Sequence, residues 1–316
     1  MKYTRFPNPL KGGSKIAIVS PAGYLTNPAF LDHVAAMIKE QGYVSVYSKN
    51  CFERYDNHYA YAGTPQQRLA DLQWACDDPD IEAIWLTRGG YGCVQLLDGL
   101  NLSGICKNPK WLIGYSDITY LHSAFNRHGI ATIHGHNVVR TLSNGVAPPA
   151  SAYGKIFDIL KGSAPAYEMI SHKLNQTGKA KGRLVGGNQT IVGALSGTRY
   201  DFDYEGAILF LEDVGENAYY RIDRQMQTLE TSGALAKIKG IIIGSMRDMG
   251  GTKSDFDETA YNLIHQITEK YKIPKIFAFP AGHVPDNYPL MMGAEVEMEV
   301  QAERYIVKYV LPHTCS

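Results

Sequence analysis

Short apolar runs alternate with amphipathic stretches through the first half of the chain. Apolar residues dominate the segments 15–20, 43–47, 81–87 and 111–115, which have the length and composition of buried strands. The stretches between them carry apolar residues at helical spacing, and residues 64–67 form a capping box with proline at the first helical position. This alternation predicts right-handed βαβ units and a mostly parallel sheet.

The pattern weakens between about 143 and 181 and then changes character. The later segments 184–195, 207–216 and 238–246 are punctuated by glycines, and residues 295–310 alternate apolar and polar positions as an antiparallel hairpin does. A mixed sheet or small barrel with a few helices is expected there. Because 316 residues exceed one average domain, we predict two. The predicted boundaries are an N-terminal α/β domain over 1–145, a linker region over 146–181 and a C-terminal domain over 182–316.

Composition narrows the class of partner. Lys plus Arg equals Asp plus Glu at 31 each, so nothing in the net charge favours nucleic acid or an anionic membrane. The first twenty residues do not have the pattern of a signal peptide, and no apolar run is long enough to span a bilayer. The five cysteines are scattered and form no CxxC pair, which favours a reducing, cytoplasmic setting without disulfides.

Two of the predicted strands end in unusual sequences. The strand at 111–115 runs into Ser116 and Asp117, and an apolar-striped helix follows. A serine on a tight strand-to-helix turn presents its hydroxyl outward, with backbone N–H groups at the helix start facing the same space. The match is partial, because Ile118 stands where a GxSxG elbow has glycine. From this tetrapeptide alone, Ser116 is equally well a helix N-cap.

The strand at 81–87 runs into the sequence RGGYG at 88–92. This loop fits neither GxGxxG nor GxxxxGK[ST], so dinucleotide or phosphate binding is disfavoured. It is instead a plain tight turn or a turn whose glycines bring backbone N–H groups close to the serine. In the second case Gly89 or Gly90 supplies an oxyanion donor.

A nucleophilic serine needs a base and an acceptor that orients the base. Among ten histidines, His283 follows an apolar strand in a loop shaped by glycine and proline. His134 and His136, in the sequence IHGH, compete with it; their alternative role is hydrogen bonding near the sheet edge.

Three acids follow the strand AILFL and are candidate acceptors for the imidazole: Glu212, Asp213 and Glu216. Each is otherwise an ordinary exposed acid. The IHGH segment is the only hint of a metal, HEXXH is absent, and we expect no catalytic metal.

Together these segments resemble the LD-carboxypeptidase family, also called muramoyltetrapeptide carboxypeptidases, to which the microcin immunity peptidases are related. The resemblance spans nearly the whole chain in the family's order. It rests on KIAIVSPAG, RGGYG, IGYSDIT, TIHGH, VGGN, LFLEDVGENAYYRIDR and FPAGHVPDN.

The resemblance implies a fold and a site. The fold is an N-terminal flavodoxin-like parallel-sheet domain joined to a C-terminal mixed, partly barrel-like β/α domain. A Ser-Glu-His triad falls on Ser116, Glu212 and His283, with the serine from the first domain and the site at the domain interface. The oxyanion donors map to the N–H of Asp117 and to Gly89 or Gly90. Homodimers without a cofactor are implied as well.

The implied reaction is hydrolysis of the bond between the L-centre of a diamino acid and the terminal D-alanine of a murein tetrapeptide. Candidate polar contacts to the substrate are Asn188, Arg221 and Arg224, whose alternative roles are a turn residue and helix-surface cations. The segment 185–189 is closer to the murein branch than to the immunity branch, although Gln189 and Thr190 differ from the Leu-Ser associated with it. An immunity-type peptidase for peptidyl-nucleotide antibiotics and a non-catalytic muropeptide-binding protein remain alternatives.

Overall fold

Two units, Met1–Ser163 and Ala164–Ser316, make up the chain in the computed structural model, which describes residues 4–27, 29–139 and 150–311. The division differs from the predicted linker over 146–181. Helix α4 (Ala150–Leu160) belongs to the first unit, and strand β8 (Ala166–Ile170) to the second. The apolar side of α4 is packed into the core of the first unit, with Ile156 and Leu160 fully buried, so this helix is not a linker between the units. Residues 146–149 lie outside the described part of the chain.

The first unit is built around a parallel sheet. Its strands are β1 (Lys15–Val19), β2 (Val44–Tyr47), β5 (Ile81–Leu86), β6 (Trp111–Gly114) and β7 (Thr132–His134). Its other helices are α1 (Ala29–Glu40), α2 (Pro65–Asp77) and α3 (Thr119–Arg127), with short 3-10 turns η1 (Cys93–Leu96) and η2 (Ser116–Ile118).

The strand order of this sheet is β2-β1-β5-β6-β7, with every pair parallel. Counted along the parallel strands alone, this is the flavodoxin-like order 2-1-3-4-5, in which ligands bind at the carboxyl ends of the strands. The predicted strands at 15–20, 43–47, 81–87 and 111–115 are therefore confirmed to within a residue. Their buried side chains form the core of the unit: Ile16, Ile18, Ile84, Trp85, Leu112 and Ile113.

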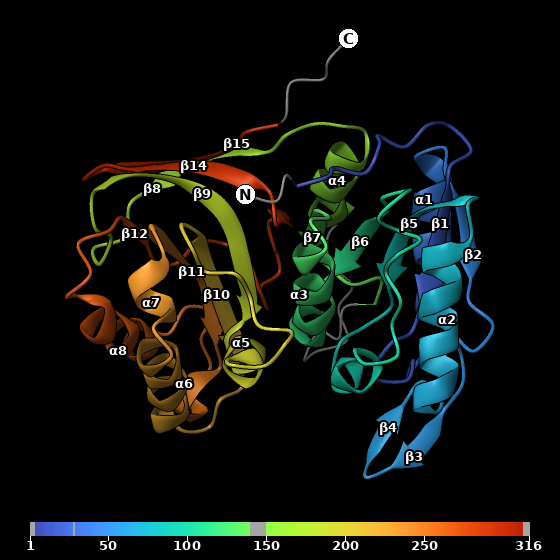
Figure 1. Cartoon of the computed structure of the whole chain (residues 1–316), viewed down its shortest axis with the longest axis horizontal. Helices are drawn as coiled ribbons and strands as arrows, with labels where there is room; N and C mark the ends of the chain where they lie inside the picture. Colours follow the sequence, from blue (N-terminus) through green and yellow to red (C-terminus); the bar gives the residue numbers. More distant parts are fainter. Residues whose placement is uncertain (1–3, 28, 140–149, 312–316) are drawn as a thin grey trace. The chain divides into compact units, whose positions relative to one another are not determined.

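A small antiparallel hairpin, β3 (Tyr55–Asn57) with β4 (Tyr59–Tyr61), extends away from this sheet below α2 (Figure 1). Helix α2 begins as predicted. Thr64 accepts from the backbone N–H of Gln67, and the Gln67 side chain accepts from the backbone N–H of Thr64. This capping box satisfies donors that the first helical turn leaves unpaired.

The second unit contains a mixed sheet with strand order β12-β11-β10-β9-β14-β15-β8. Besides β8, this sheet contains β9 (Gly178–Asn188), β10 (Ile208–Val214), β11 (Gly240–Arg247), β12 (Lys275–Ile276), β14 (Glu295–Val300) and β15 (Arg304–Tyr309). The short strand β13 (Leu290–Met292) also lies in the second unit but is not part of this sheet. The helices of this unit are α5 (Gln189–Leu195), α6 (Tyr219–Thr231), α7 (Ala234–Lys237) and α8 (Glu258–Thr268), with a 3-10 turn η3 (Met249–Gly251).

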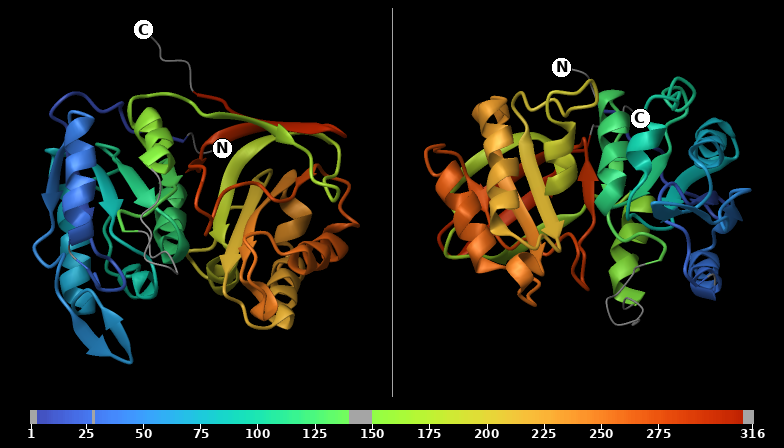
Figure 2. Two further views of the ribbon diagram at one scale, coloured as in Figure 1. Left: turned by 180° about the vertical axis from the view of Figure 1, so that it is seen from behind. Right: turned by 90° about the horizontal axis from the view of Figure 1, so that it is seen from below.

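Strand β9 connects the two halves of this sheet. Its first part pairs antiparallel with β14, and its last residues, from Leu184 to Asn188, pair parallel with β10. The strand curves between these two pairings (Figure 1, Figure 2). The hairpin β14–β15 is antiparallel, as its alternating sequence predicts. The α/β class with a parallel first sheet and a mixed, partly barrel-like second sheet is confirmed.

Candidate active site

Ser116 lies on a strained turn directly after β6. Its φ is +68°, a left-handed conformation that few residues other than glycine adopt, and its side chain is half-buried. The helix after it is apolar on the predicted side, since Ile118, Leu121 and Phe125 have no exposed surface. Of the two roles left open for Ser116, the geometry favours the elbow, because the N-cap positions of η2 and α3 are taken by Tyr115 and Ile118. A sharp strand-to-helix turn of this kind carries the nucleophile in hydrolases with an elbow.

The strand that precedes Ser116 is held by a buried histidine. The Nε2 atom of His122 lies 2.9 Å from the carbonyl oxygen of Gly114, so Nε2 carries the proton. Its Nδ1 atom then accepts from the hydroxyl of Thr132 at 2.8 Å. Burial lowers the pKa of His122 to about 3, so the ring is neutral and this pair of hydrogen bonds persists at neutral pH.

The Asp117 side chain turns into the protein and fastens the glycine loop. Its Oδ2 atom accepts from the backbone N–H of Cys93 at 2.8 Å, just after the RGGYG segment. Burial raises the pKa of this carboxyl to about 6. The Asp117 carboxylate is thus engaged in holding the loop, and the role of its backbone N–H as an oxyanion donor stays a prediction.

The glycine loop passes directly beside Ser116. A Cβ atom placed on Gly89 would lie 3.0 Å from the Cβ and 3.2 Å from the Oγ of Ser116, and 3.2 Å from the backbone nitrogen of Asp117. Gly90 has a φ of +101°, and a Cβ there would overlap the hydroxyl of Tyr59 at 2.1 Å. The backbone of Gly90 therefore favours glycine, and a side chain at position 89 would crowd Ser116. Of the two roles considered for RGGYG, this placement favours the loop beside the serine.

The acid and base candidates of the second unit meet in one hydrogen bond. Nδ1 of His283 lies 2.7 Å from Oε2 of Glu212, which projects from β10 with no exposed surface. His283 lies in the loop after β12, and its side chain keeps 17% of its surface exposed. A buried carboxylate that accepts from Nδ1–H holds the imidazole in the tautomer whose Nε2 is basic.

Two glycines make room for this pair. A Cβ on Gly282 would lie 2.6 Å from Glu212 Oε2, and φ there is +117°. A Cβ on Gly244 would lie 2.5 Å from the carbonyl oxygen of Ala281 and 3.1 Å from the Glu212 Cβ. The loop therefore approaches β10 and β11 at backbone distance.

The backbone of His283 is bound on both sides. Its N–H donates to Ser245 Oγ at 3.0 Å, and Arg247 donates to its carbonyl oxygen at 2.8 Å. The imidazole is thus carried by a loop tied to β11.

The other acid candidates contact other partners. Asp213 faces away from Glu212 and accepts from Asn188 Nδ2 at 2.8 Å and from the Thr190 hydroxyl at 2.8 Å. Burial, with the neighbouring Glu212 carboxylate, raises the pKa of Asp213 to about 6. Glu216 accepts from Thr190 at 3.0 Å. Asp213 and Glu216 thus bind polar residues at the start of α5, whereas Glu212 binds the imidazole of His283.

The three candidate substrate residues also lie in the second unit. Asn188 caps α5, accepting from the backbone N–H of Ile191 at 3.3 Å. Arg221 and Arg224 lie one turn apart on α6; Arg221 pairs with Glu216 at 3.2 Å, and Arg224 lies over the ring of Tyr220. Both alternative roles, turn residue and helix-surface cation, are thus visible, and a role in substrate binding stays a prediction.

The competing histidines are enclosed in the first unit. His134 and His136 have no exposed surface and pack against the ring of Tyr115. The backbone carbonyl of His136 accepts from the indole N–H of Trp85 at 2.8 Å. Across the described ranges of the chain, no group of three or more His, Cys, Asp or Glu side chains is arranged to hold a metal ion. None of the helices described is both long enough and apolar enough to cross a bilayer.

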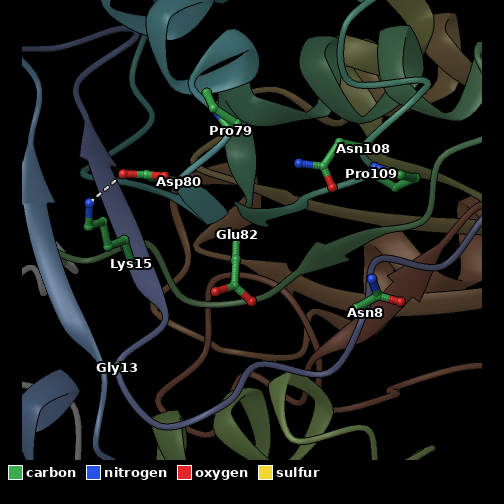
Figure 3. Close-up of a pocket in the computed structure, with 8 residues that line it drawn as sticks. All are labelled: Asn8, Gly13, Lys15, Pro79, Asp80, Glu82, Asn108 and Pro109. Carbon is green, nitrogen blue, oxygen red and sulfur yellow. Dashed lines mark hydrogen bonds and ion pairs between the residues drawn. The ribbon is translucent and has the colours of Figure 1, made fainter.

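A surface hollow of about 450 Å³ in the first unit lies at the amino ends of the sheet's strands (Figure 3). Lys15, Asp80 and Glu82 line it at the beginnings of β1 and β5, whereas Ser116 follows the end of β6. Lys15 pairs with Asp80 at 2.8 Å. Because the strands are parallel, this hollow and the candidate nucleophile lie at opposite ends of the strands.

The structure thus groups the predicted residues into two sets. Ser116, Asp117, Gly89 and Gly90 come together in the first unit, and Glu212 and His283 in the second. Sequence reasoning missed several supporting residues: Tyr59, His122, Gly244 and Ser245. Gly282 belongs to the glycine- and proline-shaped loop from which His283 was predicted.

Comparison with known proteins assigns the class. Residues 16–135 match the LD-carboxypeptidase N-terminal domain, and residues 181–298 match the LD-carboxypeptidase C-terminal domain. The murein tetrapeptide carboxypeptidase of Pseudomonas aeruginosa is 33% identical over 253 residues, which cover 76% of this chain and 80% of that protein.

Solved structures agree with the family match. The crystal structure of muramoyltetrapeptide carboxypeptidase from Oxalobacter formigenes has a TM-score of 0.81 at 25% identity, covering 93% of this chain and 98% of that chain. An MccF-like protein from Bacillus anthracis has a TM-score of 0.82 at 22% identity, covering 97% and 100%, and shares the fold. Fold and matches together define a serine-type carboxypeptidase. More specifically, the chain belongs to the LD-carboxypeptidase family.

Proposed function

We propose that this protein is an LD-carboxypeptidase that releases the terminal D-alanine from murein tetrapeptides during peptidoglycan recycling. The bond cleaved joins D-alanine to the L-centre of a diamino acid. The family match supports the reaction, and the names of the relatives from P. aeruginosa and O. formigenes support the substrate. The observation that carries the mechanism is the 2.7 Å contact between a fully buried Glu212 and a partly exposed His283.

Ser116 is the proposed nucleophile. His283 removes its proton through Nε2, because Nδ1 is engaged by Glu212. The same imidazole then protonates the departing D-alanine amine, and water releases the acyl-enzyme. Glu212 remains ionised and stabilises the imidazolium that forms in both steps. The strained backbone of Ser116, with a φ of +68°, supports this role, because a nucleophile elbow carries its serine on such a tight strand-to-helix turn.

The developing oxyanion is held by backbone donors in this proposal. The N–H of Asp117 stands at the start of the helix, and the N–H of Gly89 or Gly90 comes from the adjoining loop. The crowding of Gly89 against Ser116 and Asp117 supports the pairing of these donors. Such preorganised donors are worth several kcal/mol in acyl transfer. No metal or cofactor is required by this chemistry.

Asn188, Arg221 and Arg224 are proposed to contact the substrate. A carboxypeptidase must recognise a terminal carboxylate, and arginine binds carboxylates in a two-pronged geometry.

We also propose a cytoplasmic enzyme that forms homodimers. Sedimentation of the purified protein and fractionation of the source cells test those two points separately from activity.

Incubation with a muropeptide tetrapeptide tests the function. We expect stoichiometric release of D-alanine, and loss of at least a thousand-fold in kcat for Ser116→Ala. Ser123→Ala, on α3 in the same unit, is the matched control and should retain activity. A folded Ser116→Ala protein that released D-alanine at the wild-type rate would overturn the nucleophile assignment.

The alternative is an immunity-type peptidase. Its support is the likeness to the MccF-like structure, whose relative MccF is the microcin C7 self-immunity protein, but 22% identity carries the fold alone. Cleavage of a peptidyl-nucleotide conjugate without turnover of muropeptides would favour this alternative. Tight muropeptide binding without any turnover would instead indicate a binding protein.

A further inference from the structure

Arg68 is a fully buried arginine whose guanidinium donates to neutral acceptors and lies 4.8 Å from the centroid of the Tyr61 ring. It projects from α2 and has no exposed surface. Its Nε donates to the carbonyl oxygen of Gly63 at 3.2 Å, and one terminal nitrogen donates to the carbonyls of Pro21 at 2.7 Å and Gly92 at 3.0 Å. The other terminal nitrogen donates to the side chain of Gln95.

These acceptors belong to separate loops at one edge of the first sheet. Pro21 lies in the loop after β1, Gly63 between β4 and α2, and Gly92 at the end of the RGGYG loop after β5. A planar guanidinium presents its donors in a fixed fork, so one side chain holds all three backbones at set angles. A lysine ammonium has fewer donors and no such fork.

The RGGYG loop is held from its other side by Asp117. The carbonyl of Gly92 accepts from Arg68, and the N–H of the same peptide group, contributed by Cys93, donates to Asp117 Oδ2 at 2.8 Å. One peptide group therefore lies between a buried cation and a buried carboxylate. Each charge strengthens the hydrogen bond on its own side of that peptide, because the surroundings exclude water.

The glycine at the contact makes this approach feasible. A Cβ on Gly92 would lie 2.6 Å from the Arg68 terminal nitrogen, and φ there is +140°. The same short loop contains Gly89, which lies against Ser116. A shift of Gly92 is therefore transmitted within three residues to the backbone beside the nucleophile.

We propose that Arg68 is a positioning residue for the oxyanion hole, holding the RGGYG loop against the Ser116–Asp117 turn through the Gly92–Cys93 peptide group. This inference rests on the proposed function, in which the loop and the Asp117 N–H receive the oxyanion. A residue with this role acts on the transition state, so its loss lowers kcat more than it changes KM.

The test compares Arg68→Lys and Arg68→Ala with Lys110→Met. Lys110 is a matched control, because it is also buried and donates to backbone carbonyls, of Ala75 and Asp78, at the far end of the same helix. We expect kcat for D-alanine release to fall about ten- to a hundred-fold in both Arg68 variants, with KM changed less than threefold. Lys110→Met should lower thermal stability while retaining kcat within threefold.

Chemical rescue gives a readout that a purely structural role would not move. Arg68→Ala leaves a space shaped for guanidinium. Millimolar guanidinium should therefore raise the kcat of this variant at least tenfold, whereas sodium chloride or urea at the same concentration should not. Guanidinium should not raise the kcat of Lys110→Met. Gln95→Ala, at an exposed position, provides a variant that folds and should lower kcat two- to fivefold.

Hydrogen exchange of the free protein separates this inference from the proposed function. In Arg68→Lys or Gln95→Ala, amides of 89–93 should exchange faster while those of β6 keep wild-type protection. If the wild-type protein released no D-alanine, the proposed function would fail, yet the exchange result would still decide whether Arg68 holds the loop. Unchanged exchange at 89–93 in a folded variant, or wild-type kcat in Arg68→Lys, overturns the positioning role. If neither Arg68 variant folds, wild-type kcat together with wild-type exchange at 89–93 in Gln95→Ala overturns the positioning role as well.

Discussion

The Nδ1 atom of His283 lies 2.7 Å from Oε2 of Glu212, beneath a loop in which Gly282 permits backbone-distance approach. The carboxylate is fully buried and the imidazole is partly exposed. This arrangement places a buried negative charge against Nδ1 and leaves part of the imidazole exposed, as a general base requires.

The first prediction concerns this pair. Glu212→Gln keeps the size and a possible acceptor but removes the negative charge that stabilises the imidazolium. We expect kcat to fall about 10³- to 10⁴-fold with little change in KM, measured by D-alanine release. Asp213→Asn is the matched control, since Asp213 is equally buried on the same strand, and it should retain kcat within tenfold at saturating peptide. Equal losses in the two variants would refute a specific role for Glu212.

Gly89→Ala tests the space beside Ser116. Its φ is not in the left-handed region, so alanine adds a methyl group without backbone strain, at 3.0 Å from the Ser116 Cβ and 3.2 Å from the Oγ. We expect kcat to fall about ten- to a hundred-fold while the melting temperature shifts by only a few degrees. Gly12→Ala, where an added Cβ meets nothing within 4 Å, is the control. Wild-type kcat in Gly89→Ala would show that the loop does not constrain the serine.

The arginines of α6 make a prediction about substrate binding. If Arg221 or Arg224 binds the terminal carboxylate, replacement by alanine should raise KM about ten- to a hundred-fold, the value of a charge-assisted hydrogen bond. With a peptide amidated at its C-terminus, the same variants should differ little from wild type. Arg199→Ala, which removes another arginine lying over a tyrosine ring, should leave KM unchanged. A KM increase that persists with the amidated peptide would exclude carboxylate recognition.

Asp213 predicts a pH dependence of stability. Its pKa is about 6 in the folded protein against about 3.9 in an unfolded chain, so between pH 4 and 6 the native state binds more protons. By linkage, this group's contribution is fully present below pH 4 and is lost as pH rises through 6, by about 3 kcal/mol for a two-unit difference. Urea unfolding from pH 4 to 7 should therefore show a smaller loss of stability in Asp213→Asn than in wild type. Parallel curves for the two proteins would contradict the raised pKa.

Much of the first sheet was predictable from the chain. Buried parallel strands are continuous apolar runs bounded by turn residues, and the strands at 15–20, 43–47, 81–87 and 111–115 have this pattern. The hairpin β3–β4 has no such run, because its strands are three residues long and mostly half-buried or exposed. The first part of β9 has none either, because it alternates between half-buried and exposed positions and carries Lys179 and Lys181. Only pairing with β14 makes the segment beginning at Gly178 a strand.

The candidate site divides in the same way. Ser116 and His283 follow predicted strands in loops that contain turn-forming residues, so position along the chain was enough to propose them. Glu212 and Asp213 are consecutive residues on one strand, and side chains alternate between the two faces. Which of them meets a histidine depends on which face the loop of Gly282 covers. No local pattern contains that information.

By itself, then, the sequence determined the alternating strands and helices of the first sheet, the turns that hold Ser116 and His283, and, through its ordered motifs, the family. Local hydrophobic periodicity and turn chemistry are properties of neighbouring residues, so they can be read along the chain. The ordered motifs implied Glu212 as the partner of His283 and Gly89 or Gly90 as a neighbour of Ser116, and the tertiary structure shows the contacts of Glu212 and Gly89. The tertiary structure alone decided that Arg68 binds the loops of Pro21, Gly63 and Gly92. These are contacts between residues far apart in the chain, and only packing of the folded sheets selects them.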